Sequence, residues 1–289
     1  MKLTPLPTQG LTQQQQADII HGARFEIERL AHKETSANHI SSLRDAYATV
    51  HPATKLMVNS AIGYAMPELH KYNVLIEGPS GTGKELLAGI LAHKRQPLKA
   101  MNMAGLTDSL FQSELFGYMP GAFTGAKARG DIGFLRGVGK GTAFLDEVGE
   151  LPLGHQAKLL RVLQDKVVQP VGAVDPAPIE CRFIFATNRD LLQMVKEGKF
   201  REDLYFRINQ LSLKTQSLYE RGEAEIRHIA NAIITRERWT PLADNEYFPE
   251  TFEFGNVRAL FNLLLRRELG EIELSTYESK TDIPETTLA

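Results

Sequence analysis

VLIEGPSGTGKE, residues 74–85, joins a short apolar run to a glycine-rich turn and the start of a further apolar pattern. The apolar run predicts a buried parallel strand, and the pattern after Lys84 predicts a helix. Between them, Gly78, Gly81 and Gly83 allow backbone N–H groups to point at phosphate oxygens, which the positive end of the helix dipole also attracts. The stretch predicts a phosphate-binding loop; the alternative is an ordinary glycine-rich strand-to-helix turn.

Helical and extended patterns alternate on both sides of this loop. A helix is expected over 53–69, and the helices expected over 84–94, 108–117 and 154–165 alternate with strands expected over 97–103, 141–147 and 181–188. Such alternation is typical of an α/β fold with a parallel sheet and crossover helices. From about residue 220 no further strand is expected, and two helical patterns predict a smaller helical subdomain. An amphipathic helix is also expected over 17–30.

Composition limits the class of protein. The 289 residues are 43% hydrophobic and 24% charged, with a net charge of −2, which gives no overall reason to bind nucleic acid or an anionic membrane. The single cysteine, Cys181, lies in an apolar run and excludes a disulfide framework within the chain. No apolar run approaches the roughly 20 residues that span a bilayer, and the N-terminus has no signal core. A cytoplasmic protein is expected.

Polar residues follow two of the predicted strands. GTAFLDE, residues 141–147, delivers Asp146 and Glu147 to the carboxyl end of a strand, where ligands bind in such sheets. Asp146 could position magnesium, and Glu147 could polarise an attacking water. CRFIFATN ends in Thr187 and Asn188 beside the same edge. The alternatives are a solvated acidic loop and a turn-forming asparagine.

Arginines close to these strands have two interpretations. Arg201 and Arg207 lie six residues apart in GKFREDLYFRIN, and Arg258 lies in FGNVRAL. They are either surface arginines on amphipathic helices or groups that stabilise charge on a transferred phosphoryl group. The scattered histidines and lone cysteine predict no metal cluster of their own, and no spacing predicts a Ser-His-Asp arrangement.

PGAFTGAK, residues 120–127, is too rich in glycine and alanine for core and too apolar for an ordinary solvent loop. Its aromatic residue, Phe123, predicts contact with a partner. The alternative is a glycine-rich hairpin with an incidental Phe.

Seven ordered motifs extend the pattern: GPSGTGKE, SELFG, GAFTGA, GTAFLDEV, KLLRVLQ, ATNRDL and FREDLYFRIN. In this order they resemble the central AAA+ ATPase domain of the bacterial enhancer-binding proteins, the activators of sigma-54-dependent transcription. The resemblance is dense over residues 73–209. It implies a P-loop AAA+ core followed by a helical lid, with ATP and Mg²⁺ as cofactors.

The resemblance assigns a role to each candidate residue. Nucleotide is expected at Gly78, Pro79, Ser80, Gly81, Thr82, Gly83, Lys84, Glu85 and Arg258. Asp146 is expected to hold the metal and Glu147 to activate water, with Asn102 holding that glutamate, Thr187 and Asn188 as the first sensor, and Arg201 and Arg207 as arginine fingers acting on a neighbouring subunit. Contact with the sigma factor is expected from Gly121, Ala122, Phe123, Thr124, Gly125 and Ala126.

The chain departs from the family pattern at Pro79 and in the lid, and from the general phosphate-loop pattern at Glu85. Pro79 replaces a glutamate of the phosphate loop, Glu85 stands where phosphate loops generally have Ser or Thr, and the lid reads LYERGEAEI and EFGNVRAL rather than LRERxEDI and WPGNVREL. The phosphate loop and acidic pair are intact, so nucleotide binding is expected.

The resemblance implies a ring, expected to be a hexamer, that couples ATP hydrolysis to remodelling of sigma-54 RNA polymerase. The expected divisions are an N-terminal helical extension over 1–50, the core over 51–215, the lid over 216–274 and a flexible tail over 275–289. About thirty residues follow Arg258, too few for a helix-turn-helix, so neither sequence-specific DNA binding nor a sensory domain is expected.

Two other functions remain open. The chain could be a nucleotide-gated binding protein with little turnover, which sequesters the sigma factor or co-assembles with full-length activators. It could also be an AAA+ remodeller with a different target.

Overall fold

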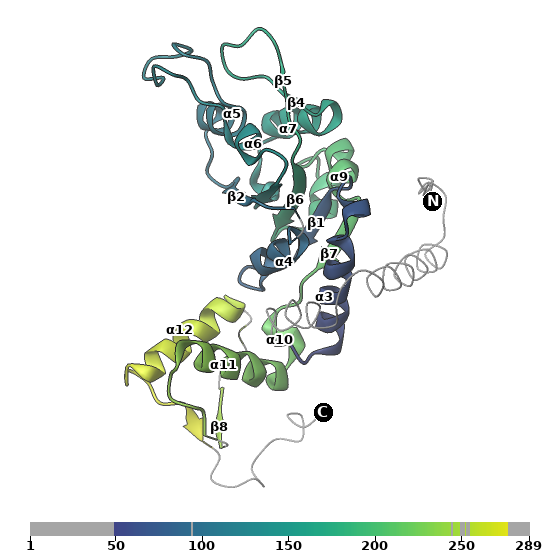
Figure 1. Cartoon of the computed structure of the whole chain (residues 1–289). Coiled ribbons are helices and arrows are strands. Elements are labelled where there is room, and N and C mark those ends of the chain that lie inside the picture. The colour runs from purple at the N-terminus through teal and green to yellow at the C-terminus, as the bar shows by residue number, and fades with distance from the viewer. Residues whose placement is uncertain (1–48, 94, 244, 249–251, 253–254, 277–289) are drawn as a thin grey trace, which may run out of the picture.

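The computed structural model describes residues 49–276 except 94, 244, 249–251 and 253–254. At its centre lies a five-stranded parallel sheet with the strand order β2-β3-β6-β1-β7 (Figure 1). The strands are β1 (Val74–Glu77), β2 (Leu98–Asn102), β3 (Thr142–Asp146), β6 (Arg182–Thr187) and β7 (Leu211–Lys214). The predicted α/β fold with a parallel sheet is confirmed. The helix expected over 17–30 lies outside the described residues.

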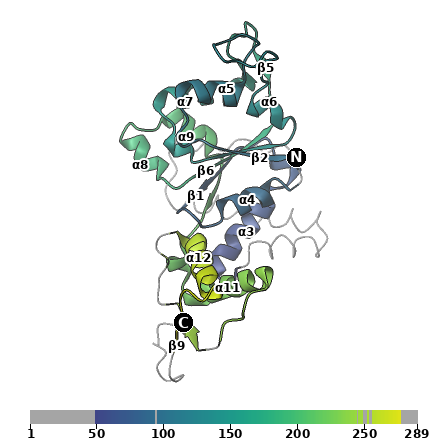
Figure 2. The same cartoon turned by 90° about the vertical axis from the view of Figure 1, so that its left-hand side faces the viewer.

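Helices cover both faces of the sheet (Figure 2). One face carries α3 (Pro52–Tyr64) and α4 (Lys84–Leu91); the other carries α5 (Asp108–Phe116), α6 (Phe134–Val138), α7 (Leu153–Asp165), α8 (Leu191–Lys196) and α9 (Glu202–Ile208). In β1, Leu75 packs into one core and Val74 and Ile76 into the other, and all three are fully buried. Burial on both faces explains why this strand is an unbroken apolar run.

The region expected as one helix over 53–69 is divided. Helix α3 ends at Tyr64, and a short 3-10 helix, η1 (Pro67–Leu69), follows it. Met66 has an extended backbone, with ψ of 142°. Proline disfavours the helical region in the preceding residue and cannot donate a backbone hydrogen bond, so Pro67 ends the first helix and begins a new turn.

Short strands were missed or wrongly excluded by the sequence pattern. Strand β7 is an edge strand with alternating exposure, so its residues do not form an apolar run. The expectation of no strand after about residue 220 was wrong, because β8 (Glu246–Tyr247) pairs with β9 (Ser275–Thr276). A second two-residue pair, β4 (Val167–Val168) with β5 (Ala177–Pro178), forms a hairpin after α7. Two-residue strands are too short to show periodicity.

The C-terminal helices form a body of their own below the sheet in Figure 1. They are α10 (Leu218–Arg221), α11 (Glu223–Glu237) and α12 (Asn256–Glu268). Their core contains Ile229 and Ile233 from α11 and Leu260 and Leu264 from α12. We refer to α10–α12 as the lid.

A buried ion pair anchors the lid to the rest of the chain. Arg221 Nη1 lies 3.6 Å from Glu225 Oε1, and both side chains are 1% exposed. Arg221 also donates to the carbonyl of Thr82 in the glycine-rich loop, at 3.2 Å. Glu225 accepts from the backbone N–H groups of Val50, at 2.7 Å, and His51, at 3.0 Å. The pair therefore joins the lid, the glycine-rich loop and the segment before α3.

Replacing Glu225 with Ala is expected to lower the free energy of unfolding by about 3–5 kcal/mol, because it leaves a buried guanidinium without its counter-charge. Urea unfolding at constant slope measures the change. The matched control is Glu237→Ala at the exposed end of α11, where the ion pair with Arg236 is solvated and the expected loss is below about 1 kcal/mol. Equal losses in the two variants would contradict the anchoring role.

Candidate functional site

The loop between β1 and α4 has a backbone that only glycine allows. Gly78, Gly81 and Gly83 have φ of 147°, 75° and 94°. A Cβ added to Gly78 would lie 2.0 Å from Thr215 Oγ1, and one added to Gly81 would lie 2.3 Å from the carbonyl oxygen of Gly255. Core and lid thus close around the loop, and side chains at these positions would push them apart.

Lys84 begins helix α4 and is mostly buried. Its Nζ donates to the carbonyls of Gly78, at 2.9 Å, and Pro79, at 3.1 Å. Burial lowers the pKa of Lys84, while the carboxylates of Glu147 and Asp146 act in the opposite direction. An ammonium group on loop carbonyls at a helix N-terminus is placed where phosphate oxygens would find a cation and free N–H groups.

A cavity of about 960 Å³ opens beside this lysine. Its walls come from the glycine-rich loop and α4 (residues 80–86), from the ends of β2 and β3 (Asn102, Asp146 and Glu147) and from the lid. The lid contributes three arginines, Arg221, Arg236 and Arg258, and apolar side chains that include Ile229 and Phe261. One wall therefore suits phosphates and metal, and the other suits a flat apolar base.

The acidic pair lies at the carboxyl end of β3. Asp146 is the register partner of Asn102 on β2. Glu147 has a left-handed backbone with φ of 54°, an uncommon conformation for a non-glycine residue. Its Oε2 accepts the backbone N–H of Asn188 at 3.2 Å, whereas Asn102 Oδ1 accepts the N–H of Ala104 at 2.8 Å. The glutamate is thus oriented by the end of β6, and the Asn102 amide caps a local turn.

The end of β6 lies behind the acidic pair. Thr187 is fully buried, and its Oγ1 accepts the N–H of Arg189 at 3.1 Å. Asn188 is exposed. Neither residue lines the cavity, and Asn188 contacts the site through the bond that its N–H donates to Glu147.

Helix α12 approaches the glycine-rich loop from the lid. Arg258 Nη1 lies 3.4 Å from Ser80 Oγ, and the N–H of Val257 donates to the carbonyl of Gly81 at 3.1 Å. Asn256 Nδ2 donates to the carbonyl of Ser80 at 2.9 Å, and its Oδ1 accepts the N–H of Leu218 at 2.7 Å. Asn256 therefore joins the glycine-rich loop to the lid. The sequence interpretation missed this residue. The available signal was an asparagine directly after a glycine, because asparagine tolerates the left-handed backbone, with φ of 50°, that Asn256 adopts.

The sequence interpretation also missed Arg221, Arg236 and the apolar lid side chains of the cavity. Arg221 lies in LYERGEAEI, a stretch with no strong periodicity. Ile229 and Ile233 are spaced four residues apart on α11, a pattern that predicts core packing as well as it predicts a cavity wall. Only the approach of the lid to α4 assigns these residues to the cavity.

Arg201 and Arg207 lie away from this cavity, on the far side of the sheet. Arg201 is exposed and makes a two-point ion pair with Asp203, at 3.0 and 2.7 Å, which lowers the pKa of that carboxyl. Arg207 Nη2 donates to the carbonyl of Leu163 on α7, at 2.8 Å. Neither arginine lines the cavity of its own chain.

The GAFTGA segment tops a loop between α5 and α6, at the end of the molecule opposite the lid (Figure 1). Tyr118 and Asp131 close its base with two backbone hydrogen bonds of 2.9 Å. The hairpin after β4 lies alongside it, where the N–H of Val171 donates to Gly117 and the N–H of Met119 to Val171, both at 2.9 Å. The loop is an insertion that is held by the Tyr118–Asp131 pair at its base and by the neighbouring hairpin.

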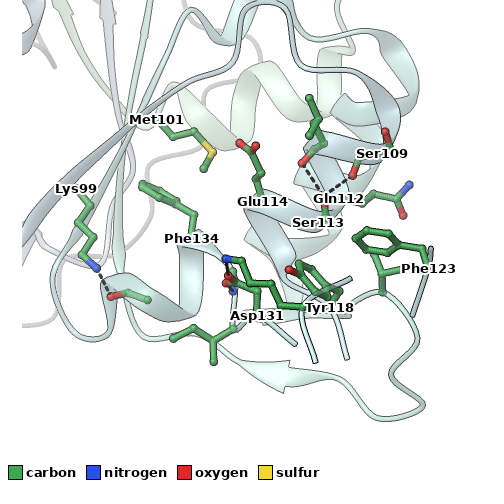
Figure 3. Close-up of a pocket in the computed structure, with 16 residues that line it drawn as sticks. Lys99, Met101, Ser109, Gln112, Ser113, Glu114, Tyr118, Phe123, Asp131 and Phe134 are labelled. Atoms are coloured by element: carbon green, nitrogen blue, oxygen red, sulfur yellow. Dashed lines mark hydrogen bonds and ion pairs between the residues drawn. The ribbon is translucent and has the colours of Figure 1, made fainter. Parts of the chain in front are cut away.

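Phe123 is 44% exposed at this loop, and its ring lies 5.0 Å from that of Tyr118 (Figure 3). Both rings line a second cavity, of about 920 Å³, between the loop, α5 and β2. In the rest of the segment, Gly121, Thr124 and Gly125 are exposed, and Ala122 and Ala126 are half-buried. Apolar surface is thus presented at a protruding tip.

A glycine-rich loop after β1, an acidic pair after β3 and a helical lid over the cavity define a P-loop ATPase domain of the AAA+ class. The family model of the Sigma-54 interaction domain matches residues 52–214. The chain belongs to this family, that of the AAA+ domains of bacterial enhancer-binding proteins.

The chain is also similar in sequence and structure to individual transcriptional regulators. Regulatory protein AtoC of Escherichia coli (strain K12) is 38% identical over 220 residues, covering 73% of this chain and 47% of AtoC. DNA-binding transcriptional regulator NtrC of Rhizobium meliloti (strain 1021) is 37% identical over 230 residues, covering 74% and 47%. The crystal structure of NtrX from Brucella abortus in complex with ATP matches with a TM-score of 0.66 and 25% identity, covering 82% of this chain and 56% of that one. The chain thus spans about half the length of these relatives.

Within the described residues, no helix combines the length and apolarity that crossing a membrane requires. The same residues hold no group of three or more His, Cys, Asp or Glu side chains suited to a metal ion. A magnesium ion shared with nucleotide phosphates needs only one or two protein carboxylates, which Asp146 could supply.

Proposed function

We propose that this chain hydrolyses ATP as one subunit of a hexameric ring and uses the GAFTGA loop to remodel sigma-54 RNA polymerase. The observation that supports it most directly is the joint arrangement of Lys84, Asp146 and Glu147 around one cavity, with Phe123 at a separate tip. Contact with RNA polymerase implies that the protein acts in the cytoplasm. The proposed divisions are residues 1–50, the core over 51–215, the lid over 216–274 and a tail over 275–289.

The residues around the cavity divide the chemistry among them. Lys84 exchanges its loop carbonyls for phosphate oxygens, and the N–H groups of residues 80–85 bind the same phosphates. Glu147, held by the N–H of Asn188, orients and deprotonates the attacking water. A magnesium ion on Asp146, when bound, would neutralise charge on the phosphates. Arg258 and Ser80 fix the lid against the same phosphates.

The position of Arg201 supports a ring. Arg201 is exposed and far from its own cavity, so a contribution to hydrolysis requires the nucleotide of a neighbouring subunit. An arginine supplied in this way accelerates phosphoryl transfer by about 10³-fold or more. The movement of Phe123 then follows from differential contacts made with and without the γ-phosphate.

ATP hydrolysis per subunit, measured across protein concentrations, tests the proposal. We expect the specific rate to rise steeply as rings form and to fall to background in Lys84→Ala. Arg201→Ala should bind ATP normally and hydrolyse it about 10³-fold more slowly. Mixing these two inactive variants should restore activity, because one brings an intact loop and the other an intact arginine.

A specific rate that is independent of concentration, or a mixture that stays inactive, would contradict the shared site. A negligible rate in the wild type with normal ATP binding would favour the nucleotide-gated binding protein, an alternative that the divergent lid stretch LYERGEAEI supports.

A further inference from the structure

His155 lies in the first turn of α7 and contacts the helix that leads into the GAFTGA loop. The residue is 2% exposed, its Nε2 bonds to the carboxylate of Asp108 at the start of α5, and its ring stacks on Phe111 with centroids 4.0 Å apart and planes 3° apart. Phe111 in turn packs edge-on against Phe116, the last residue of α5. A displacement of His155 therefore acts on α5 directly.

Gln156, the next residue of α7, binds the backbone of Arg201 at the start of α9. Its side chain is fully buried, and its Oε1 accepts the backbone N–H of Arg201 at 2.8 Å. Its Nε2 donates to the carbonyls of Leu151, at 2.8 Å, and Lys199, at 3.0 Å. The backbone of Arg201 is thus attached to α7 by a side chain that has no free polar atom.

Helix α7 has a second pair of attachments at its other end. Arg207 donates to the carbonyl of Leu163 near the end of α7, and Val171, in the hairpin that follows, pairs with the base of the GAFTGA loop. Figure 2 shows α7 between α5 and α9 on one face of the sheet. Arg201 and Arg207 are thus both attached to α7, and the hairpin that supports the loop follows the same helix.

Packing alone does not account for His155. Its Nδ1 is buried without a hydrogen-bond partner among the described residues. An apolar side chain stacked on Phe111 would avoid this unsatisfied polar atom. What the imidazole provides instead is the bond to Asp108, a residue whose side chain is 82% exposed.

We propose that His155 and Gln156 are positioning residues that join Arg201 to helix α5, so that engagement of Arg201 with a neighbouring subunit's nucleotide moves the GAFTGA loop. The inference rests on the proposed ring ATPase. To reach a neighbour, Arg201 must leave Asp203, and Gln156 transfers the accompanying backbone shift to α7. His155 passes it to α5. The coupling is a free energy of interaction between Arg201 and the contact of His155 with α5. A double-mutant cycle can therefore measure it.

The chain allows the loop to be observed directly. Cys181 is its one cysteine, and burial raises the pKa of that thiol to about 11. Since the thiolate is the reactive form, a cysteine introduced at exposed Ala128 can be labelled selectively. An environment-sensitive fluorophore at Ala128→Cys lies in the loop but outside GAFTGA.

The test compares hydrolysis with the fluorescence change caused by ADP and aluminium fluoride, which imitate the transferring phosphate. Asp108→Ala should keep ring formation and at least half of the hydrolysis rate but lose at least about fivefold in loop response. Asp108→Asn, which keeps an acceptor for His155, should recover most of it. The matched control is Asp165→Ala, which removes an exposed carboxylate of α7 that does not contact His155.

Arg201→Ala should lose the loop response as well, and the double variant with Asp108→Ala should respond no less than Arg201→Ala alone, because both act on one route. A full loop response in Asp108→Ala overturns the inference and leaves the ring ATPase standing. Parallel losses of hydrolysis, loop response and melting temperature would show a structural role only and also overturn it. A wild type without concentration-dependent hydrolysis removes the proposed function and the inference together.

Discussion

Replacing Glu147 with Gln is expected to slow ATP hydrolysis at least about a hundredfold while ATP affinity stays within about twofold, the behaviour of a lost general base. The amide keeps the size of the side chain and an oxygen that can accept the N–H of Asn188. It cannot take a proton from water. Single-turnover hydrolysis and equilibrium binding of a fluorescent ATP analogue measure the two quantities separately.

Glu150→Gln is the matched control for this substitution. Glu150 lies in the next turn, η2 (Val148–Glu150), but its carboxylate pairs with Arg189 and does not line the cavity. We expect normal hydrolysis in this variant. Unchanged hydrolysis in Glu147→Gln would remove the assigned role, and slow hydrolysis in both variants would indicate a general disturbance of the turn.

Replacing Phe123 with Ala is expected to abolish binding to sigma-54 in the presence of ADP and aluminium fluoride, while ATP hydrolysis falls by less than about twofold. An aromatic anchor at the centre of an interface contributes about 2 kcal/mol or more, equivalent to at least about 30-fold in affinity. The ring is 44% exposed and its neighbour is Tyr118, so its removal leaves the nucleotide cavity untouched. Pull-down with purified sigma-54 measures the loss.

Leu269→Ala removes an exposed apolar side chain at the end of α12, far from the loop, and should leave sigma-54 binding unchanged. Loss of hydrolysis together with binding in Phe123→Ala would contradict the separation of chemistry from partner contact. Normal binding in Phe123→Ala would favour the remaining alternative, an AAA+ remodeller with another target.

The nucleotide side of the site was largely predictable from sequence. The phosphate loop is local, and its glycines, Lys84 and the following helix are specified within a dozen residues. The acidic pair was predictable because carboxyl ends of parallel strands meet at one edge, which brings Asp146 beside Asn102. The roles of these residues stay predictions, as do those of Thr187, Asn188, Arg201, Arg207 and Arg258.

The lid wall was not predictable in the same way. Arg221 and Asn256 are separated from the phosphate loop by well over a hundred residues, and each contacts it through backbone carbonyls. A side chain that bonds to a distant carbonyl leaves no trace in local periodicity. The same holds for His155, which sits within an amphipathic helix pattern and gains its meaning only from Asp108 and Phe111.

By itself, the sequence determined the α/β class, the phosphate loop and the family, because these depend on local hydrophobic periodicity and on motifs whose residues act within a few positions of one another. Only the tertiary structure decided which arginines face the cavity, that Glu147 accepts the N–H of Asn188, and that α7 contacts both the backbone of Arg201 and the start of α5. These contacts depend on how helices and strands pack, and packing brings together residues whose separation along the chain encodes nothing about their distance in space.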